Sequence, residues 1–217
     1  MKTIIAIDGP AAAGKGTLAR RIAGVLGLPY LDTGLLYRAV GRRVLDAGGD
    51  PADAGAAEAA ARALRPEDLD RADLRGPQAD AAATAVAAVA AVRAALLAFQ
   101  REFATRNGAV LDGRDIGTVI FPEAQAKLFV TARLAERTRR RWLELQAKGV
   151  AVDIADVEQE MRRRDEKDSA REAAPLRAAE DAFILDTSTL DADAAFRVAI
   201  GFVRARTGLA CTVPRTG

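Results

Sequence analysis

Histidine is absent from the 217-residue sequence, and Cys211 is its only cysteine. A chain without imidazole cannot use histidine as a general base, and a single cysteine excludes intrachain disulfides and the common Cys/His zinc sites. Little use of cysteine is typical of reducing compartments, so we expect a cytoplasmic location. Any catalysis must therefore rest on carboxylates, fixed cations, hydroxyls or backbone groups.

Long apolar runs and an excess of one charge are also missing. The N-terminal segment MKTIIAIDGP has an apolar run of only four residues before Asp8, too short for a signal peptide. The alanine-rich run at 81–92 falls well short of the roughly 20 residues that a membrane span requires. The 32 basic and 30 acidic residues nearly cancel, which gives no support to an extended nucleic-acid surface. We therefore expect no membrane and no nucleic-acid partner, whereas a small anionic ligand stays open.

Apolar runs and helical periodicities alternate along the chain. Half of the residues are apolar, which suffices for one compact domain or for one domain carrying mobile appendages. Residues 51–107 are alanine-rich and mostly helical in pattern, with breaks near Pro66 and Gly76. Strands that alternate with helices predict an α/β fold with a parallel sheet. The predicted strands are 2–8, 30–34, 109–113, 126–132 and 182–186, and the other predicted helices are 15–26, 35–45, 133–148, 153–168 and 191–206.

The segment AIDGPAAAGKGT at 6–17 nearly matches the phosphate-binding pattern G-x-x-x-x-G-K-[ST], except that Gly16 replaces the usual hydroxyl. Gly9 and Gly14 permit a tight turn whose N–H groups can converge on phosphate oxygens, and Lys15 would reach the outer phosphates. Because the hydroxyl has moved to Thr17, about 100° further round the helix, we expect Mg²⁺ to keep most of its waters. The expected ATP-binding residues are Gly9, Pro10, Ala11, Ala12, Ala13, Gly14, Lys15, Gly16 and Thr17.

Two later segments carry residues that could bind a second anion. In LDTGLLYR, Thr33 stands at the N-cap of a predicted helix, and Arg38 follows one turn after Gly34. In LDGRDIGTVIFP, a strand ends at Asp112, where phosphate-binding-loop proteins keep a carboxylate near the metal, and Arg114 and Asp115 follow. An ordinary capped helix and a solvated turn are the alternatives for these two segments.

Arginines recur at helical spacing in the second half of the chain. On the helix at 133–148 they share one broad face, and apolar residues on the other side would face the core. The arginines are Arg133, Arg137, Arg140 and Arg141, and the apolar residues are Leu134, Trp142, Leu143 and Leu145. In RRRDEKDSAR, the spacing places Arg164, Asp168 and Arg171 on one helical stripe if the helix runs that far. A solvated arginine face and a simple ion pair four residues apart are the alternatives.

The form G-K-G-T is that of nucleoside monophosphate kinases. The segments IDGPAAAGKGTLA, LDTGLLYR, LDGRDIGTVIFP and RRRDEKDSAREAAPL, in this order, together resemble bacterial cytidylate kinases. This resemblance implies a three-layer P-loop NTPase-type α/β fold in which a parallel five-stranded sheet is flanked by helices, with a helical monophosphate-binding segment and a lid. It also implies a monomer that phosphorylates CMP and dCMP with ATP and Mg²⁺. One departure is the insert at 50–76, which is shorter than in the bacterial members and shows no clear strands, so its structure stays open.

The resemblance also implies roles for particular residues. The core would comprise 1–33, 108–135 and 169–217, with the monophosphate-binding segment at 34–107 and the lid at 136–168. Thr17 and Asp112 would hold the metal, in part through water. The implied catalytic residues are Lys15, Arg114, Arg137, Arg141 and Arg171. The implied CMP-binding residues are Thr33, Arg38, Thr84, Arg93, Arg114, Asp115, Arg164, Asp168 and Arg171, among which Asp115 would read the cytosine amine.

Phosphoryl transfer to a monophosphate suits a chain without histidine. The acceptor oxygen is already anionic near neutral pH, so the reaction needs arginines that cancel charge and no strong base. A kinase for a small alcohol would need a carboxylate base such as Asp32 or Asp112, and a monophosphate kinase of other or broader base specificity, such as UMP/CMP, is a closer alternative. A non-enzymatic ATP-binding regulatory protein would need no second anion site, and its Arg38, Arg114 and Arg171 would be dispensable.

Overall fold

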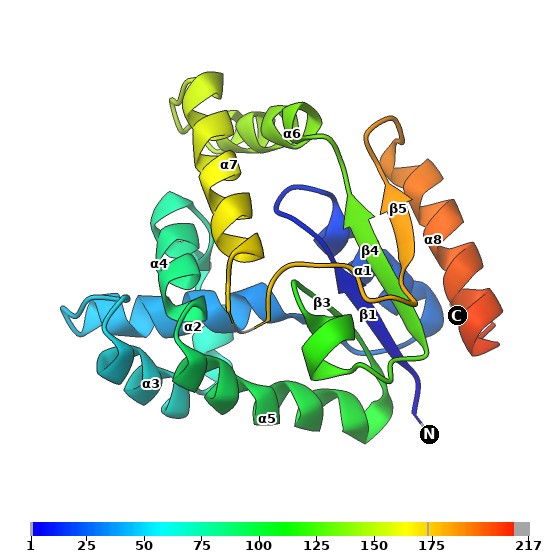
Figure 1. The fold of residues 1–217 in the computed structure, drawn as a ribbon, viewed down its shortest axis with the longest axis horizontal. Helices are drawn as coiled ribbons and strands as arrows, with labels where there is room; N and C mark the ends of the chain where they lie inside the picture. Colours follow the sequence, from blue (N-terminus) through cyan, green and yellow to red (C-terminus); the bar gives the residue numbers. More distant parts are fainter. Residues whose placement is uncertain (1, 173, 211–217) are drawn as a thin grey trace, which may run out of the picture. The chain divides into compact units, whose positions relative to one another are not determined.

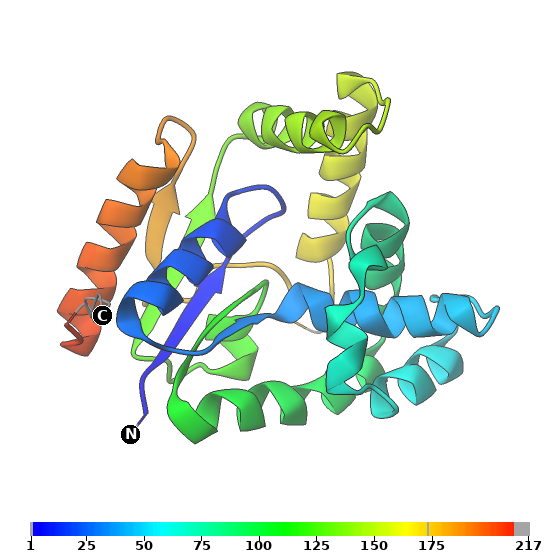
Figure 2. The same cartoon turned by 180° about the vertical axis from the view of Figure 1, so that it is seen from behind.

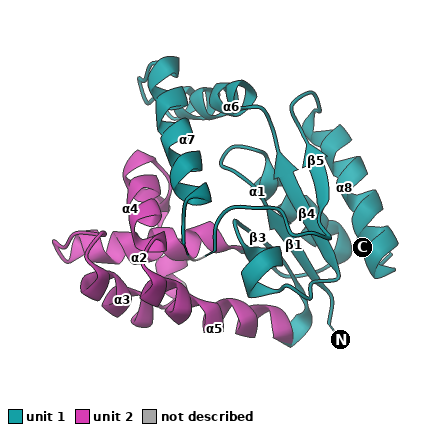
Figure 3. Ribbon diagram, viewed as in Figure 1, with its two compact units in different colours: residues 1–31, 106–217 teal, residues 32–105 magenta. Residues whose placement is uncertain are grey.

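The computed structural model describes residues 2–172 and 174–210, and Cys211 lies outside these residues. The chain divides into two compact units (Figure 3). Unit 1 comprises residues 1–31 and 106–217, and unit 2 comprises Asp32–Thr105. Each unit is described here by itself.

Unit 1 is built around a parallel sheet with the strand order β2-β3-β1-β4-β5. The sequence predicted all five strands, and their bounds are Ile4–Asp8 (β1), Tyr30–Asp32 (β2), Ala109–Gly113 (β3), Ala126–Thr131 (β4) and Phe183–Asp186 (β5). Every residue of β1 and β3 is buried, which explains why these strands read as continuous apolar runs. The central strand β1 leads directly into the phosphate-binding pattern.

Helices α1 and α8 cover one face of this sheet, as Figure 2 shows. Their bounds are Lys15–Leu26 (α1) and Ala192–Thr207 (α8), and their apolar residues join those of the strands in one core. Helices α6 (Leu134–Ala147) and α7 (Ile154–Ser169) pack on each other beyond the carboxyl ends of the strands (Figure 1). A helical turn, η3 (Ile116–Ile120), follows β3. The fold class predicted from the sequence, a parallel sheet flanked by helices, is therefore confirmed.

The amphipathic reading of α6 was partly wrong. Leu145 is buried between α6 and α7, but Leu143 is 45% exposed, because α7 covers only part of the apolar side. Arg137, which the spacing placed on the arginine face, is buried instead. A helical period locates a polar face but does not reveal which part of it another helix covers.

Unit 2 is helical. Its elements are α2 (Thr33–Asp46), α3 (Ala54–Arg62), η1 (Pro66–Asp70), η2 (Ala72–Leu74), α4 (Pro77–Ala87) and α5 (Ala90–Asn107), whose last turn enters unit 1. Helix α2 packs against α3 and α4, and Gly41 allows the close approach to α4, since a Cβ there would lie 2.7 Å from the Ala82 Cβ. The insert at 50–76 consists of α3, two short helical turns and connecting loops, and its backbone forms no strand.

Among the residues that the structure describes, no single helix is long and apolar enough to cross a membrane. Helices α4 and α5 meet the combined requirement of length and apolar composition only as a pair, and the chain bends by 99° between them.

Candidate functional site

The loop between β1 and α1 has a backbone that few residues other than glycine can adopt. Gly9 has a φ of 144°, and a Cβ at this position would lie only 1.9 Å from the Val130 carbonyl oxygen of β4. Gly14 has a φ of 94°, and Ala12 also lies in the left-handed region. Left-handed residues among right-handed ones turn successive N–H groups toward one side, which is the arrangement that binds anions. The loop at 9–14 therefore has the backbone geometry of an anion-binding loop.

Lys15 is folded into this loop. Its side chain is buried, and its Nζ donates a hydrogen bond of 2.7 Å to the Pro10 carbonyl oxygen across the loop. Burial, helped by the positive charge of Arg114, lowers the pKa of Lys15 to about 7. An anion beside Lys15 would reverse this shift, so the loop is electrostatically suited to phosphate.

Gly16 explains the departure from the usual phosphate-binding pattern. A Cβ at Gly16 would lie 3.2 Å from Oδ2 of Asp112 and 3.6 Å from the Tyr30 hydroxyl. The buried Asp112 carboxylate thus stands beside the first turn of α1, where a larger residue would crowd it. The Asp112 carboxylate, and the exposed Thr17 hydroxyl one residue after Gly16, both carry oxygens of the kind that Mg²⁺ prefers. No group of three or more acidic, histidine or cysteine side chains suited to a metal occurs in the described part of the chain, so these residues fit an ion that the nucleotide phosphates also hold.

Asp8 is a site residue that sequence reasoning missed. Its buried carboxylate accepts hydrogen bonds from the N–H groups of Ile116 and Gly117, both at 2.8 Å. These two residues directly follow Arg114 and Asp115. Burial raises the pKa of Asp8 to about 6, although the two hydrogen bonds oppose this shift. The only sequence signal was an acidic residue at the end of a buried strand.

Asp168 brings two of the predicted arginines together. Its Oδ2 accepts from Nε of Arg114 at 2.8 Å, and its Oδ1 accepts from Nη2 of Arg171. Burial alone would raise the pKa of Asp168, but the charges of Arg114 and Arg171 hold it below its usual value. Burial would likewise lower the pKa of Arg114, yet Asp168 raises it. Arg114 therefore stays charged inside the protein.

This arginine group lies near the loop. The charges of Arg114 and Arg164 both lower the pKa of Lys15, and the charge of Asp112 opposes them. Asp115 is buried, and its negative charge contributes to the raised pKa of Asp8. Unit 1 thus gathers the following predicted residues around one loop: Lys15, Asp112, Arg114, Asp115, Arg164, Asp168 and Arg171.

The two predicted lid arginines differ in their surroundings. Arg137 donates to the Ala132 carbonyl oxygen at 2.9 Å and to the Asp165 carboxylate at 2.6 and 3.2 Å. It also reaches the Ala11 carbonyl oxygen of the phosphate loop at 3.4 Å. Arg141, by contrast, forms an ion pair of 3.0 Å with Glu144 on its own helix. Arg137 is therefore joined to the loop, and Arg141 is paired with a glutamate of α6.

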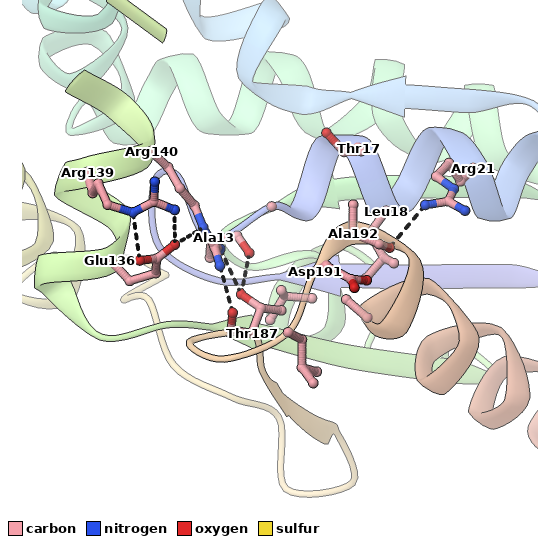
Figure 4. A pocket seen from close by; sticks show the side chains of 14 residues that line it. Ala13, Thr17, Leu18, Arg21, Glu136, Arg139, Arg140, Thr187, Asp191 and Ala192 are labelled. Carbon is pink, nitrogen blue, oxygen red and sulfur yellow. Dashed lines mark hydrogen bonds and ion pairs between the residues drawn. The ribbon is translucent and has the colours of Figure 1, made fainter. Parts of the chain in front are cut away.

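A cavity of about 300 Å³ adjoins the loop, between α6 and the start of α8 (Figure 4). Arg140 reaches across it and donates to Oγ1 and the carbonyl oxygen of Thr187, at 3.0 and 2.6 Å. The Thr187 hydroxyl in turn donates to the Ala13 carbonyl oxygen at 3.1 Å. Leu18, Val130 and Leu190 supply an apolar lining. A flat base attached to phosphates in the loop would suit this cavity, which the sequence did not predict because residues 187–192 carry no motif.

Four predicted acceptor residues lie in unit 2. Arg38 of α2 is paired with the buried Asp80 of α4, and Thr84 donates to the Asp80 carbonyl oxygen at 2.9 Å. The Arg93 guanidinium lies 5.8 Å from the centre of the Tyr37 ring. The N-cap prediction for Thr33 was wrong by one position: Asp32 keeps an extended backbone and is the N-cap, and the buried Thr33 is the first helical residue.

Comparisons with known proteins agree along the length of the chain. The family model described as cytidylate kinase matches residues 5–203. A cytidylate kinase of Granulibacter bethesdensis is 63% identical over 204 residues, which cover 94% of this chain and 98% of that protein. A cytidylate kinase of Acidiphilium cryptum is 62% identical over 200 residues, covering 92% and 94% respectively. A solved structure of an uncharacterized protein from Eubacterium ventriosum has a TM-score of 0.57 at 16% identity and covers 94% of this chain and 100% of its own, which shows a shared fold alone.

Proposed function

The chain belongs to the cytidylate kinase family, and we propose that it transfers the γ-phosphoryl group of ATP to CMP, forming ADP and CDP. The observation that carries this proposal is the arginine pair on Asp168, because it would supply a second anion site near the loop at 9–14. The charge of Arg114 lowers the pKa of Lys15, which supports a proposal in which the donor and acceptor phosphates lie close together.

The donor site would be the loop and its adjoining cavity. The residues from Gly9 to Thr17 would bind the phosphates of ATP, with Lys15 on the outer ones, and the cavity beside Arg140 and Thr187 would take the adenine. Asp112 and Thr17 would hold Mg²⁺, which neutralises phosphate charge when it is bound. The segment at 136–168 would act as the lid, with Arg137 and Arg141 on the transferring group.

The acceptor residues would be those that membership of the family implies. Arg38, Arg114 and Arg171 would bind the CMP phosphate, and the base pocket would contain Asp115, Thr84 and Arg93. Both carboxylate oxygens of Asp168 already accept hydrogen bonds from arginines. Its main role would therefore be to hold Arg114 and Arg171 in place, in addition to its contact with the ribose of CMP. The remaining acceptor residues would be Thr33 and Arg164. The segment at 34–107 would form the monophosphate-binding part.

These residues account for transfer without a general base. An acceptor phosphate is ionised near neutral pH, so its oxygen can attack without losing a proton to the protein. The barrier is then the repulsion between two anions, which fixed guanidinium groups and Lys15 reduce at no cost of reorganisation. A closed lid would exclude water and so favour CMP over hydrolysis.

Asp115 would select the base. A carboxylate accepts a hydrogen bond from the N4 amine of cytosine, whereas uracil presents the acceptor O4 at the same position. In a buried site the wrong base leaves a charged group without its partner. We therefore propose that the enzyme prefers CMP and dCMP to UMP as phosphoryl acceptors, with broader UMP/CMP use as the alternative. We also propose that it is a monomer in the cytoplasm.

The test is an acceptor panel in a coupled assay of ADP release. With ATP and CMP, dCMP, UMP, AMP or GMP, we expect CMP to exceed UMP by at least about tenfold in kcat/KM. Arg114→Ala and Arg171→Ala should weaken the binding of CMP far more than the binding of ATP. The matched control is Arg62→Ala, which removes an exposed arginine paired with Glu58. This variant should leave the KM for CMP and the KM for ATP unchanged. ADP release that is independent of every acceptor would contradict the proposal.

A further inference from the structure

Arg38 forms the least exposed of the arginine ion pairs that α2 makes in unit 2. Its Nε and Nη2 lie 3.0 and 2.9 Å from the same oxygen, Oδ1 of Asp80. The Asp80 side chain is 6% exposed and that of Arg38 is 19% exposed, whereas the pair between Arg43 and Asp68 on the same helix is 32% and 16% exposed. Burying two charges gains little stability over apolar packing. The burial of this pair therefore indicates a task other than stability.

The other end of the Arg38 guanidinium lies at the start of α2. A Cβ built on Gly34 would come within 3.0 Å of Nη1 of Arg38 and within 3.0 Å of Oδ1 of Asp32. Nη1 thus overlies the first turn of the helix, where backbone N–H groups have no partner within the helix and attract anions. Gly34 leaves the room that the guanidinium occupies.

We propose that Asp80 and Gly34 are positioning residues that hold Arg38 ready for the acceptor phosphate. Asp80 holds the Nε side of the guanidinium, which directs Nη1 to the N-terminal turn of α2, and Gly34 keeps that place open. This inference rests on the proposed function of Arg38 as a ligand of the CMP phosphate.

The expected gain is one of preorganisation. An arginine side chain has many rotamers, and a free one must be ordered when the ligand binds. A fixed guanidinium meets the phosphate in place, and displacements of about 1 Å in such groups can cost up to about 10²-fold in rate. Because the partner is the phosphate, the effect should be confined to ligands that carry one.

Two variants test the proposal. Asp80→Asn removes the charge that holds Arg38, and Gly34→Ala displaces Nη1 while it improves the helix propensity of α2. For both we expect the KM for CMP to rise about tenfold, with the KM for ATP and the inhibition constant of cytidine unchanged. Gly34→Ala should keep or raise the melting temperature, which separates the effect from damage to the fold. Asp68→Asn, which removes the partner of Arg43, is the matched control and should leave all constants unchanged.

Other results would overturn the proposal. A lower KM for CMP in Asp80→Asn would show that Asp80 competes with the phosphate for Arg38. Equal increases in the KM for CMP and the KM for ATP would show general structural damage. Arg38→Ala separates this inference from the proposed function. If it leaves the KM for CMP unchanged, Arg38 does not bind the phosphate; if it raises that KM while Asp80→Asn and Gly34→Ala do not, only the positioning role is wrong.

Discussion

Replacing Asp8 by asparagine should stabilise the protein at neutral pH and impair its activity. The Asp8 carboxylate is 5% exposed, and burial raises its pKa from 3.8 to about 6. The native protein therefore keeps this proton to a higher pH than the unfolded chain does. Stability must then fall as the pH rises from about 4 to 6, because the native state loses a proton that the unfolded state has already released.

The size of the effect follows from the shift. At 1.36 kcal/mol per unit of pKa, the ionised Asp8 costs about 3 kcal/mol at pH 7.5 relative to its neutral form. An asparagine is neutral at every pH and has nearly the shape of the protonated acid. We expect Asp8→Asn to exceed the wild type in free energy of unfolding at pH 7.5, and the difference to shrink by about 2 kcal/mol on going to pH 4.5. The raised pKa of Asp8 already includes the effects of two neighbouring charges: Asp115 raises it and Lys15 lowers it.

Activity should move in the opposite direction. The ionised carboxylate accepts from both Ile116 and Gly117, but an amide has only one oxygen, and its NH₂ would face the second N–H donor. The turn that carries Arg114 and Asp115 would shift, and we expect kcat/KM for CMP to fall about tenfold.

Urea unfolding at pH 4.5 and 7.5, followed by circular dichroism, measures the stability difference. Asp186→Asn is a control of opposite sign, since hydrogen bonds from Ser188 lower the pKa of the exposed Asp186. Because the lowered pKa of Asp186 stabilises the native state at every pH above the unfolded value of 3.8, that variant should be less stable than the wild type at both pH 4.5 and pH 7.5, by nearly the same amount. If Asp8→Asn were less stable than the wild type at pH 7.5, or if the difference did not change with pH, the reasoning would be refuted.

Three further predictions concern the loop and the base. Lys15→Met should keep the fold, as checked by circular dichroism, and lower kcat by about 10²-fold or more, because the Lys15 charge stabilises phosphoryl transfer. A nearly normal kcat would show that the loop takes no part in the mechanism. Asp115→Asn can rotate its amide to donate to uracil O4, so CMP activity should fall and the CMP/UMP ratio of kcat/KM should narrow; an unchanged ratio would exclude Asp115 as the reader. Gly9→Ala should lower the melting temperature, since its Cβ would collide with the Val130 carbonyl oxygen, and an unaltered melting curve would contradict the loop geometry.

The sequence predicted the sheet well because buried parallel strands leave short apolar runs that are easy to recognise. The phosphate loop was equally clear, since the left-handed backbone at Gly9 and Gly14 can be read from the residues themselves. The insert at 50–76 was not predictable in detail, because its short helical turns depend on packing in unit 2 and have little periodicity of their own.

The partners of the charged residues could not be predicted. Asp8 meets its donors across 108 and 109 residues of chain, Asp80 lies 42 residues from Arg38, and Arg137 meets Asp165 on another helix. Local patterns give no sign of such contacts, which depend on how the elements pack. The helical stripe predicted for Arg164, Asp168 and Arg171 was wrong for Arg171, because α7 ends at Ser169, and only the fold brings Arg171 and Arg114 to the Asp168 carboxylate. The functional roles of all these residues stay predictions.

Product analysis tests the central claim most directly. The purified protein would be mixed with ATP, Mg²⁺ and CMP, and the nucleotides followed in time by ³¹P NMR or by anion-exchange chromatography. Direct transfer predicts that one CDP forms for each ADP, and that little ADP forms when CMP is left out. ADP that forms at the same rate with and without CMP, and without matching CDP, would contradict a cytidylate kinase and favour a protein that only binds and hydrolyses ATP.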